Sequence, residues 1–449
     1  MTRHYVFVES NTTGTGRLAV ERLLARGQRV TFVTRQPTKY PFLAQRPAPP
    51  TLRVAEVETN DAAAVEACVR AIAAERPIDA LLTFSTFYVP LVAELAARLG
   101  HRYLDPQAAL TCHEKHRMRA VLSRAGLPTP GFWLVRSAEE AEWLSTGIAY
   151  PCVVKPTAES GSTGVRRVDD RDQLLAHVRT LASRTVNERG QALAGEVLVE
   201  RFVSGPEFSV ETLTRSRGDT VVLGVTRKHL SAPPCFVELG HDFPADLDEA
   251  TRTALEDATL AALDAVGFDL GPAHTELRLS PEGPVVIEIN PRLAGGMIPE
   301  LVRHATGLDL LELVLAQLVG DPVDLTPTRR QHAAIRFVTS NRDGRLAAIR
   351  GVHAARASHG VCEVAIDRSI GAAVRSPSCA ADRLGYIIAT GEGAVAASAA
   401  ERALAHIRLD VDGPIAHRAG RSTEHRFGHL IDRTIWRPTD LSLDHSLTD

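Results

Sequence analysis

The stretch VVIEINPR, residues 285–292, decides the fold together with HTELR, residues 274–278. Successive side chains of a strand point to opposite faces, so Glu288 and Asn290 share one face while the two isoleucines of the stretch share the other. Apolar residues on one face and oxygen donors on the other are typical of a strand with one buried side and one functional side.

A hairpin places a second carboxylate on the functional face. Residues 280–284 (SPEGP) read as a turn, and a hairpin centred on its glutamate pairs Glu276 with Glu288, because both lie equally far from that centre. These two carboxylates and Asn290 then converge beside Arg292. Hard oxygen donors are the ligands that Mg²⁺ prefers, so the hairpin predicts a site for Mg²⁺ and a polyphosphate.

The composition, with 44% apolar and 23% charged residues, is that of a soluble globular protein. A chain of 449 residues is long enough for two or three domains. A net charge of -3 and the lack of any run near ~18 apolar residues lead us to expect neither nucleic acid nor a membrane as a partner. Six scattered cysteines without a CxxC pair, and no signal peptide, favour a reducing cytoplasm.

The first hundred residues alternate between strand-like and helix-like segments. This alternation predicts an α/β fold with a parallel sheet and crossover connections. The proline-rich residues 36–52 are expected to form a surface loop. The expected strands are residues 5–9, 29–34 and 79–84, and the expected helices are residues 17–26 and 89–99.

Gly14-Thr15-Gly16 follows the first expected strand and admits two interpretations. The glycines could bring a dinucleotide phosphate to a helix N-terminus. However, Ala19 stands where the third glycine of that fingerprint belongs, and the second strand closes on Thr34 and Arg35 instead of an acidic residue. A tight turn from strand to helix is therefore the favoured interpretation.

The pattern changes to α+β after about residue 112. A helix at residues 112–125 is followed by GLPTP, residues 126–130, which is a boundary and an extended connection. The α+β pattern continues to about residue 320. Beyond 330 we expect strands at residues 333–338, 361–366 and 384–390, a helix at 393–407 and a polar tail from 424.

Lys155 ends a short apolar strand, residues 150–156. A lysine at the end of a buried strand needs a partner for its ammonium, and a phosphate oxygen would serve, although the side chain could also reach solvent. A loop of small residues, 160–165 (SGSTGV), follows. Its glycines let the backbone approach an anion closely, although it lacks the Gly-Lys-Ser/Thr of a Walker A loop. Read alone, the loop would be a hairpin tip, but its place directly after an apolar strand with a terminal lysine favours anion binding.

Residues 197–210 read as a strand, a bend and a second strand. An extended bend between apolar walls could recognise adenine through its main chain. Glu200 and Glu207 could then face an adenine amino group or a neighbouring lysine and the ribose hydroxyls. The alternative is an ordinary hairpin with two solvated acids.

These elements, in this order, resemble the ATP-grasp superfamily, and specifically carboxylate–amine ligases of the L-amino-acid ligase type, which are related to biotin carboxylase and D-alanine–D-alanine ligase. The resemblance covers about residues 5–320. It implies a pre-ATP-grasp Rossmann-like parallel sheet, a two-part ATP-grasp fold and a C-terminal α+β cap. The implied domains are residues 1–112, 113–322 (lid-like part 113–198, metal and substrate part 199–322) and 323–449.

The resemblance also implies a role for each matching residue. Glu276, Glu288 and Asn290 would hold two Mg²⁺ ions, for which Mn²⁺ could substitute. Arg292 would bind the carboxylate substrate and its acyl phosphate, and Gly295 and Gly296 would line the substrate pocket. The implied ATP-binding residues are Lys115, Lys155, Ser160, Gly161, Ser162, Thr163, Gly164, Glu200, Phe202, Val203 and Glu207.

Residues 233–245 are similar to a substrate-binding loop of the amino-acid ligases. There Glu238 would pair with a substrate ammonium, and His241 would take the proton of the attacking amine. The alternative is a solvated Glu238 and a His241 that caps the following turn.

The activity implied by the resemblance is ATP-dependent formation of an amide bond between a carboxylate, an amino acid, and an amine. An acyl phosphate would be the intermediate, and ADP and phosphate would be released. Both substrates would be small molecules, and a homodimer is compatible with the resemblance. Because Gly296 lacks a side chain, we expect an open pocket wall and a bulky substrate. A carboxylase, a purine-pathway ligase, a non-catalytic nucleotide-binding module and a dehydrogenase remain as alternatives.

Overall fold

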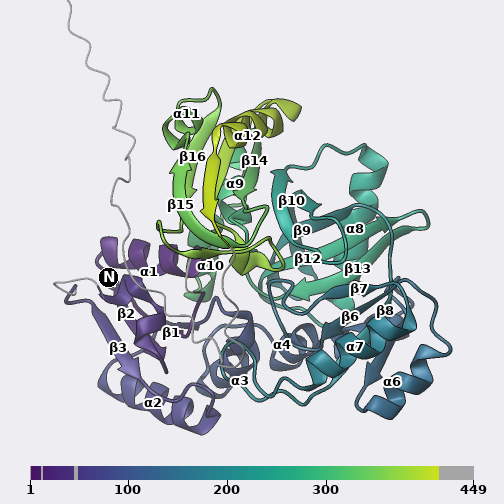
Figure 1. Ribbon diagram of the computed structural model, residues 1–449. Coiled ribbons are helices and arrows are strands. Elements are labelled where there is room, and N and C mark those ends of the chain that lie inside the picture. The colour runs from purple at the N-terminus through teal and green to yellow at the C-terminus, as the bar shows by residue number, and fades with distance from the viewer. Residues whose placement is uncertain (1, 12–13, 45–48, 414–449) are drawn as a thin grey trace, which may run out of the picture.

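The alternating segments near the N-terminus form a parallel sheet in the computed structural model, which describes residues 2–11, 14–44 and 49–413 (Figure 1). The strand order is β3-β2-β1-β4, and all three pairings are parallel. Helix α1 covers one face of this sheet, and α2 and α3 pack on the other. The bounds are β1 His4–Val8, α1 Thr15–Ala25, β2 Arg29–Thr34, β3 Leu52–Glu56, α2 Ala62–Glu75, β4 Ala80–Leu82 and α3 Val89–Leu99.

The proline-rich segment is not the surface loop that the sequence predicts. Its described part contains two 3₁₀ helices, Pro37–Lys39 and Pro41–Ala44, and Tyr40 is fully buried. The ring of Tyr40 meets Phe32 edge-on with 4.8 Å between centroids. Aromatic packing against the sheet therefore overrides the local proline signal.

The carboxyl edge of the parallel sheet, where α/β folds usually bind ligands, is filled by the chain itself. The buried guanidinium of Arg189 donates to the Tyr40 hydroxyl at 3.0 Å and to the Ser10 carbonyl at 2.9 Å. A Cβ on Gly16 would lie 2.0 Å from the Ser10 side-chain oxygen. The glycines thus serve the tight turn, as the sequence interpretation favours.

The single helix expected at residues 112–125 is wrong, because the chain forms two helices, α4 (Pro106–His113) and α5 (Lys115–Arg124). Glu114 between them is extended. The backbone N–H of Lys115 donates to the Thr157 carbonyl at 3.1 Å, so a contact with the following domain replaces helix continuation.

Residues 132–201 form a small antiparallel sheet of order β5-β8-β6-β7, which carries helices α6 and α7. Figure 1 places this unit at the lower right, away from the parallel sheet. The bounds are β5 Phe132–Val135, α6 Ala138–Ser145, β6 Cys152–Pro156, β7 Arg166–Val168, α7 Arg171–Ala182 and β8 Val197–Arg201.

The largest sheet is antiparallel and runs in the order β13-β12-β9-β10-β11-β14-β18-β16. Helix α8 covers one face, and α9 and α10 cover the other and join it to the parallel sheet. The bounds are β9 Glu207–Ser216, β10 Asp219–Leu230, β11 Glu238–Phe243, α8 Glu249–Ala265, β12 Gly271–Ser280, β13 Gly283–Asn290, α9 Ile298–Thr306, α10 Leu310–Leu318, β14 His332–Val338, β16 Val361–Ile366 and β18 Gly385–Gly391.

Three C-terminal strands, β14, β18 and β16, extend this large sheet. Strand β14 pairs with β11, which lies almost a hundred residues earlier, and β18 and β16 follow. A three-stranded sheet and two helices complete the cap. Their bounds are β15 Gly344–Arg350, α11 Val352–Arg356, β17 Ala373–Val374, α12 Ala394–His406 and β19 Arg408–Asp412. The expected polar tail from residue 424 lies outside the described residues.

The fold is thus a Rossmann-like parallel sheet, a two-part antiparallel unit and an α+β cap, as the resemblance implies. In the part of the chain that the structure describes, no helix has both the length and the apolar character needed to cross a membrane.

Candidate active site

The β12–β13 hairpin has the predicted register. Glu276 pairs with Glu288, and His274 pairs with Asn290, so all four side chains share one face. Behind them the buried Ile289 packs into the core covered by α8. The predicted pair is confirmed, but the turn alone does not produce it. The tight turn pairs Ser280 with Gly283, and a β-bulge after Glu276 shifts the register by one residue and so brings Glu276 opposite Glu288.

Each of the two hairpin carboxylates, Glu276 and Glu288, contacts a different buried lysine. Lys115, which begins α5, places its ammonium 3.1 Å from Glu288 and donates to the Glu159 carbonyl at 2.9 Å. Lys228 of β10 lies 2.8 Å from Glu276. The hairpin face is therefore lined by alternating acids and cations.

Lys228 is a buried cation of the site that the sequence analysis does not predict. Its ammonium also lies 3.2 Å from Glu207 and 2.9 Å from Glu238, and only 2% of its side chain is exposed. Burial alone would lower the pKa of Lys228, but its three carboxylates raise it well above its usual value. A signal was available, because the β9–β10 turn at residues 217–218 pairs Glu207 with Lys228 by the same centring rule.

His274 lies between two carboxylates on the same face. Its Nδ1 is 3.0 Å from Glu211, and its Nε2 is 3.2 Å from Glu276. Burial would lower the pKa of His274, but the two acids outweigh burial and raise it to about 9. At pH 7 an imidazolium therefore holds Glu276 in place.

Lys155 and Glu200 form a buried ion pair of 2.7 Å where the small sheet ends. Arg119 of α5, fully buried, is 2.8 Å from the same carboxylate and also donates to the Ile287 carbonyl of β13. Glu200 thus contacts a neighbouring lysine, one of the two options that the sequence left open. These bonds connect the small sheet to the β12–β13 hairpin.

The small-residue loop joins β6 to β7, as a hairpin tip should. The Ser162 hydroxyl donates to the Phe236 carbonyl at 3.1 Å. The Gly161 carbonyl accepts from the N–H of Ala380 at 3.4 Å. The loop therefore touches both the 233–245 segment and the C-terminal region.

The bend after Glu200 does not belong to an ordinary hairpin, because β8 and β9 lie in different sheets. The ring of Phe202 stacks on Phe236 with centroids 6.2 Å apart. Arg278 donates to the Val203 carbonyl at 3.0 Å and to Glu207 at 3.1 Å. The bend thus brings main-chain groups, an aromatic face and an acid to the seam between the two sheets.

Gly296 does not open a pocket wall, and that expectation is wrong. A Cβ on Gly296 would meet Nε2 of His241 at 2.6 Å, so the imidazole fills this space. His241 is fully buried, and neither ring nitrogen has a hydrogen-bond partner among the described residues. Burial lowers the pKa of His241 to about 3, which keeps the ring neutral. At Gly295, in contrast, a Cβ would meet nothing within 4 Å.

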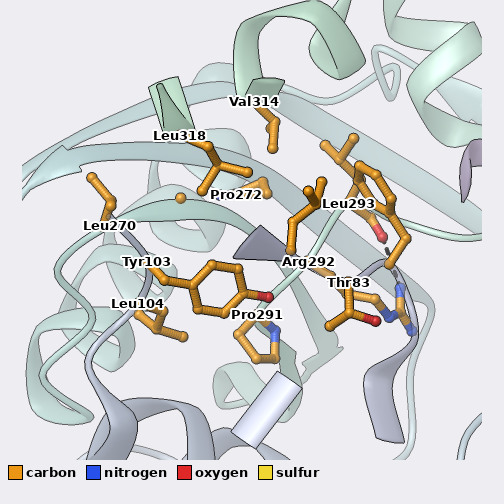
Figure 2. A pocket seen from close by; sticks show the side chains of 13 residues that line it. Thr83, Tyr103, Leu104, Leu270, Pro272, Pro291, Arg292, Leu293, Val314 and Leu318 are labelled. Atoms are coloured by element: carbon orange, nitrogen blue, oxygen red, sulfur yellow. Dashed lines mark hydrogen bonds between the residues drawn. The ribbon is translucent and has the colours of Figure 1, made fainter. Parts of the chain in front are cut away.

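Arg292 follows the hairpin, and its guanidinium contacts the Thr86 hydroxyl and the Leu293 carbonyl. It also donates to the side-chain oxygen of Asn290 at 3.2 Å. Burial lowers the pKa of Arg292. An apolar cavity of about 30 Å³ lies beside it. Figure 2 shows Tyr103 and, from helix α10, Val314 and Leu318 among the side chains that line this cavity.

The donor set of the hairpin fits a hard cation. Among the described residues there is no group of three or more His, Cys, Asp or Glu side chains placed to hold a metal. The predicted set instead combines two carboxylates with the amide of Asn290 on one face. Oxygen-only donors supplied by one or two carboxylates suit Mg²⁺.

Family models match three parts of the chain. An ATP-grasp domain matches residues 148–300, an ATP-grasp N-terminal domain matches residues 23–101, and an L-amino acid ligase C-terminal domain 2 matches residues 336–412. The last match falls on the region beyond 330, where the sequence is least informative.

Several proteins are similar to this chain. An uncharacterized protein of Sinorhizobium fredii, y4rH, is 30% identical over 87% of this chain and 79% of its own length. A D-alanine–D-alanine ligase of Pseudomonas putida is 27% identical over 47% of the chain, which spans 65% of that ligase.

Solved structures extend the likeness to the fold. The L-amino acid ligase from Bacillus licheniformis has a TM-score of 0.77 and 26% identity, with 92% of this chain and 99% of that one covered. A phosphoribosylglycinamide synthetase from Anaerococcus prevotii has a TM-score of 0.67 at 15% identity, over 92% of this chain and all of that one, and shares the fold alone.

Proposed function

The chain belongs to the ATP-grasp superfamily, and we propose that it is an ATP-dependent ligase that joins the carboxylate of an amino acid to an amine. The observation that carries the proposal is the hairpin face, where Glu276, Glu288 and Asn290 lie among buried cations and beside Arg292. The likeness to an L-amino acid ligase over nearly the whole chain supports this chemistry over that of a carboxylase.

ATP would lie in the seam between the small sheet and the large sheet. Phe202, Val203 and Glu200 would border the adenine, Glu207 would bind the ribose, and Lys115 and Lys155 would neutralise phosphate charge. The phosphate loop, Ser160, Gly161, Ser162, Thr163 and Gly164, would close over the phosphates with its backbone N–H groups and hydroxyls.

Glu276, Glu288 and Asn290 would hold the Mg²⁺ ions. Bound there, Mg²⁺ would supply positive charge that stabilises the transferring phosphoryl group. Lys228 and Lys115 now neutralise the two carboxylates, and the arrival of a cation would free these ammonium groups for phosphate oxygens.

The reaction would have two steps, and side chains of this chain would act in each. Arg292 would hold the substrate carboxylate while a carboxylate oxygen attacks the γ-phosphate of ATP, which gives an acyl phosphate and ADP. An amine would then displace phosphate. His241, whose ring nitrogens have no hydrogen-bond partner among the described residues, would take the proton that the amine must lose. Glu238, Gly295 and Gly296 would border the same substrate space.

The domain boundaries that we propose are 112/113 and 322/323, with the lid-like part ending near 198. The large sheet continues across the second boundary, from β11 into β14. The cap would therefore close the substrate side of the site as part of the same sheet.

The test is product formation from ATP, Mg²⁺ and pooled amino acids, with ADP measured enzymatically and amides identified by mass spectrometry. Wild-type protein should form ADP and an amide in equal amounts. Glu288→Gln should lower the rates of ADP and amide formation at least about 100-fold. Glu282→Gln, on the exposed turn of the same hairpin, should keep both rates. Full ADP formation by Glu288→Gln would contradict the metal assignment.

A further inference from the structure

Arg383 brings a cation from the C-terminal region into the substrate side of the site. It directly follows the 3₁₀ helix η4, Ala380–Asp382, and precedes β18. Its Nη2 donates to the Glu238 carboxylate at 2.6 Å, and its Nε donates to the Glu238 carbonyl at 3.1 Å. Only 13% of the Arg383 side chain is exposed.

The guanidinium is held by packing as well as by hydrogen bonds. Its central carbon lies 3.8 Å from the centroid of the Phe337 ring, in a cation–π arrangement. Phe337 in turn meets the ring of His241 edge-on, with centroids 5.6 Å apart and an interplanar angle of 84°. Arg383, Phe337, His241 and Gly296 therefore form one continuous wall.

The backbone that presents Arg383 is fixed by a local network. The carboxylate of Asp382 accepts from the N–H groups of Ser378 and Cys379, at 2.8 and 3.1 Å. Ala380 rests on Gly161 of the phosphate loop. A rigidly placed arginine loses little freedom when it binds a ligand, which favours affinity.

The charges on this wall favour an anion over an ammonium. The single carboxylate of Glu238 already contacts two cations, Lys228 at 2.9 Å and Arg383 at 2.6 Å. Glu238 is thus neutralised before any substrate ammonium arrives. Nη1 of Arg383 donates no hydrogen bond to any residue that the structure describes. Its two N–H groups are available to a carboxylate.

The wall also lies close to the reacting groups that we propose. Lys228 contacts Glu238 and Glu276 with the same ammonium, so a chain of three ion pairs links Arg383 to the β12–β13 hairpin. In an α-amino acid the carboxylate and the amine are attached to one carbon. An amine that attacks an acyl group near Arg292 would therefore bring its own carboxylate to the same side of the site.

We propose that Arg383 determines the specificity for the second substrate by binding its carboxylate. This inference rests on the proposed ligase function and names the class of the amine: an amino acid or another amine with a nearby carboxylate. Glu238 orients Arg383 through two hydrogen bonds.

The experiment compares two nucleophiles in wild-type protein, Arg383→Gln and Arg383→Lys. Hydroxylamine, which has no carboxylate, traps the acyl phosphate as a hydroxamate, and the amino acid that wild-type protein couples best serves as the second nucleophile. Arg383→Gln should raise the KM for the amino acid about 30- to 100-fold and leave hydroxamate formation within about 2-fold of wild type. Arg383→Lys should recover part of the loss.

Exposed Arg375, in the same C-terminal region, gives the matched control, and Arg375→Gln should change neither reaction. An equal loss with both nucleophiles in Arg383→Gln would mean a structural role and overturn the inference, as would an unchanged KM for the amino acid. If wild-type protein forms neither hydroxamate nor amide, the proposed function fails as well. The hydroxamate arm thus separates the two failures.

Discussion

The protonated state of His274 should make the stability of the protein depend on pH. The folded pKa of about 9 lies above the ordinary value of 6.5, so folding binds this proton more tightly. The difference is about 2.5 pH units, and each unit is worth about 1.4 kcal/mol, so the contribution is about 3 kcal/mol. It is fully present below pH 6.5 and is lost as the pH rises through 9. The lowered pKa of Glu276 reflects part of the same interaction and adds nothing further.

The assay is urea unfolding of wild-type protein and His274→Gln at pH 5.5 and pH 10, followed by far-UV circular dichroism. The advantage of wild type over the variant should be about 3 kcal/mol larger at pH 5.5. A histidine NMR signal that titrates near 9 and disappears in the variant would identify the group directly.

The matched control is His101→Gln. Burial lowers the pKa of His101, so any pH dependence that it contributes has the opposite sign. A wild-type advantage at His274 that is the same at both pH values, or larger at pH 10, would refute the reasoning.

Three further changes test the same structure. Lys228→Met removes a buried cation from three carboxylates and should cost about 3–5 kcal/mol in urea unfolding; an unchanged midpoint would show that this cluster is not stabilised by its charge. Gly296→Ala forces a Cβ against His241 at a φ of +59° and should cost about 1–3 kcal/mol and lower turnover, whereas Gly295→Ala should do neither; equal behaviour of the two variants would contradict the close approach. Arg189→Ala loses two buried charge-assisted hydrogen bonds and should cost about 2–3 kcal/mol in thermal unfolding, with wild-type stability as the contrary result.

The elements that the sequence predicts well are those whose signals are local. Strand β2 and helix α3 have the expected bounds, because apolar periodicity and flanking breakers act over a few residues. The pairing of Glu276 with Glu288 is predicted from a turn centred on Glu282, but the structure reaches it through a turn at residues 281–282 and a β-bulge after Glu276. The turn centre sets hairpin register only to within such a bulge.

The parts that escaped prediction depend on contacts between distant segments. The break at Glu114 follows from a hydrogen bond to Thr157, and the burial of Tyr40 follows from Phe32. Local propensity carries no information about such partners.

The candidate site shows the same division. Its acids stand out in the sequence because they interrupt apolar strands, whereas Arg383 lies 145 residues from Glu238 and carries no motif of its own. The closeness of His241 to Gly296 likewise depends on how α9 meets β11, which a glycine in a sequence does not reveal. The small size of Gly296 therefore predicts an open pocket wall, whereas the His241 ring fills that space.

The continuity of the large sheet limits how this protein can be cut or recombined. Strand β11 pairs with β10 on one side and with β14 on the other. A chain truncated before β14 would leave β11 as an unpaired edge, which invites aggregation. A chimaera that takes its cap from a relative would have to preserve the β11–β14 register, since a slip of one residue would turn each side chain of the grafted strand to the opposite face. The two parts of the sheet, before and after β11, therefore form one structural unit.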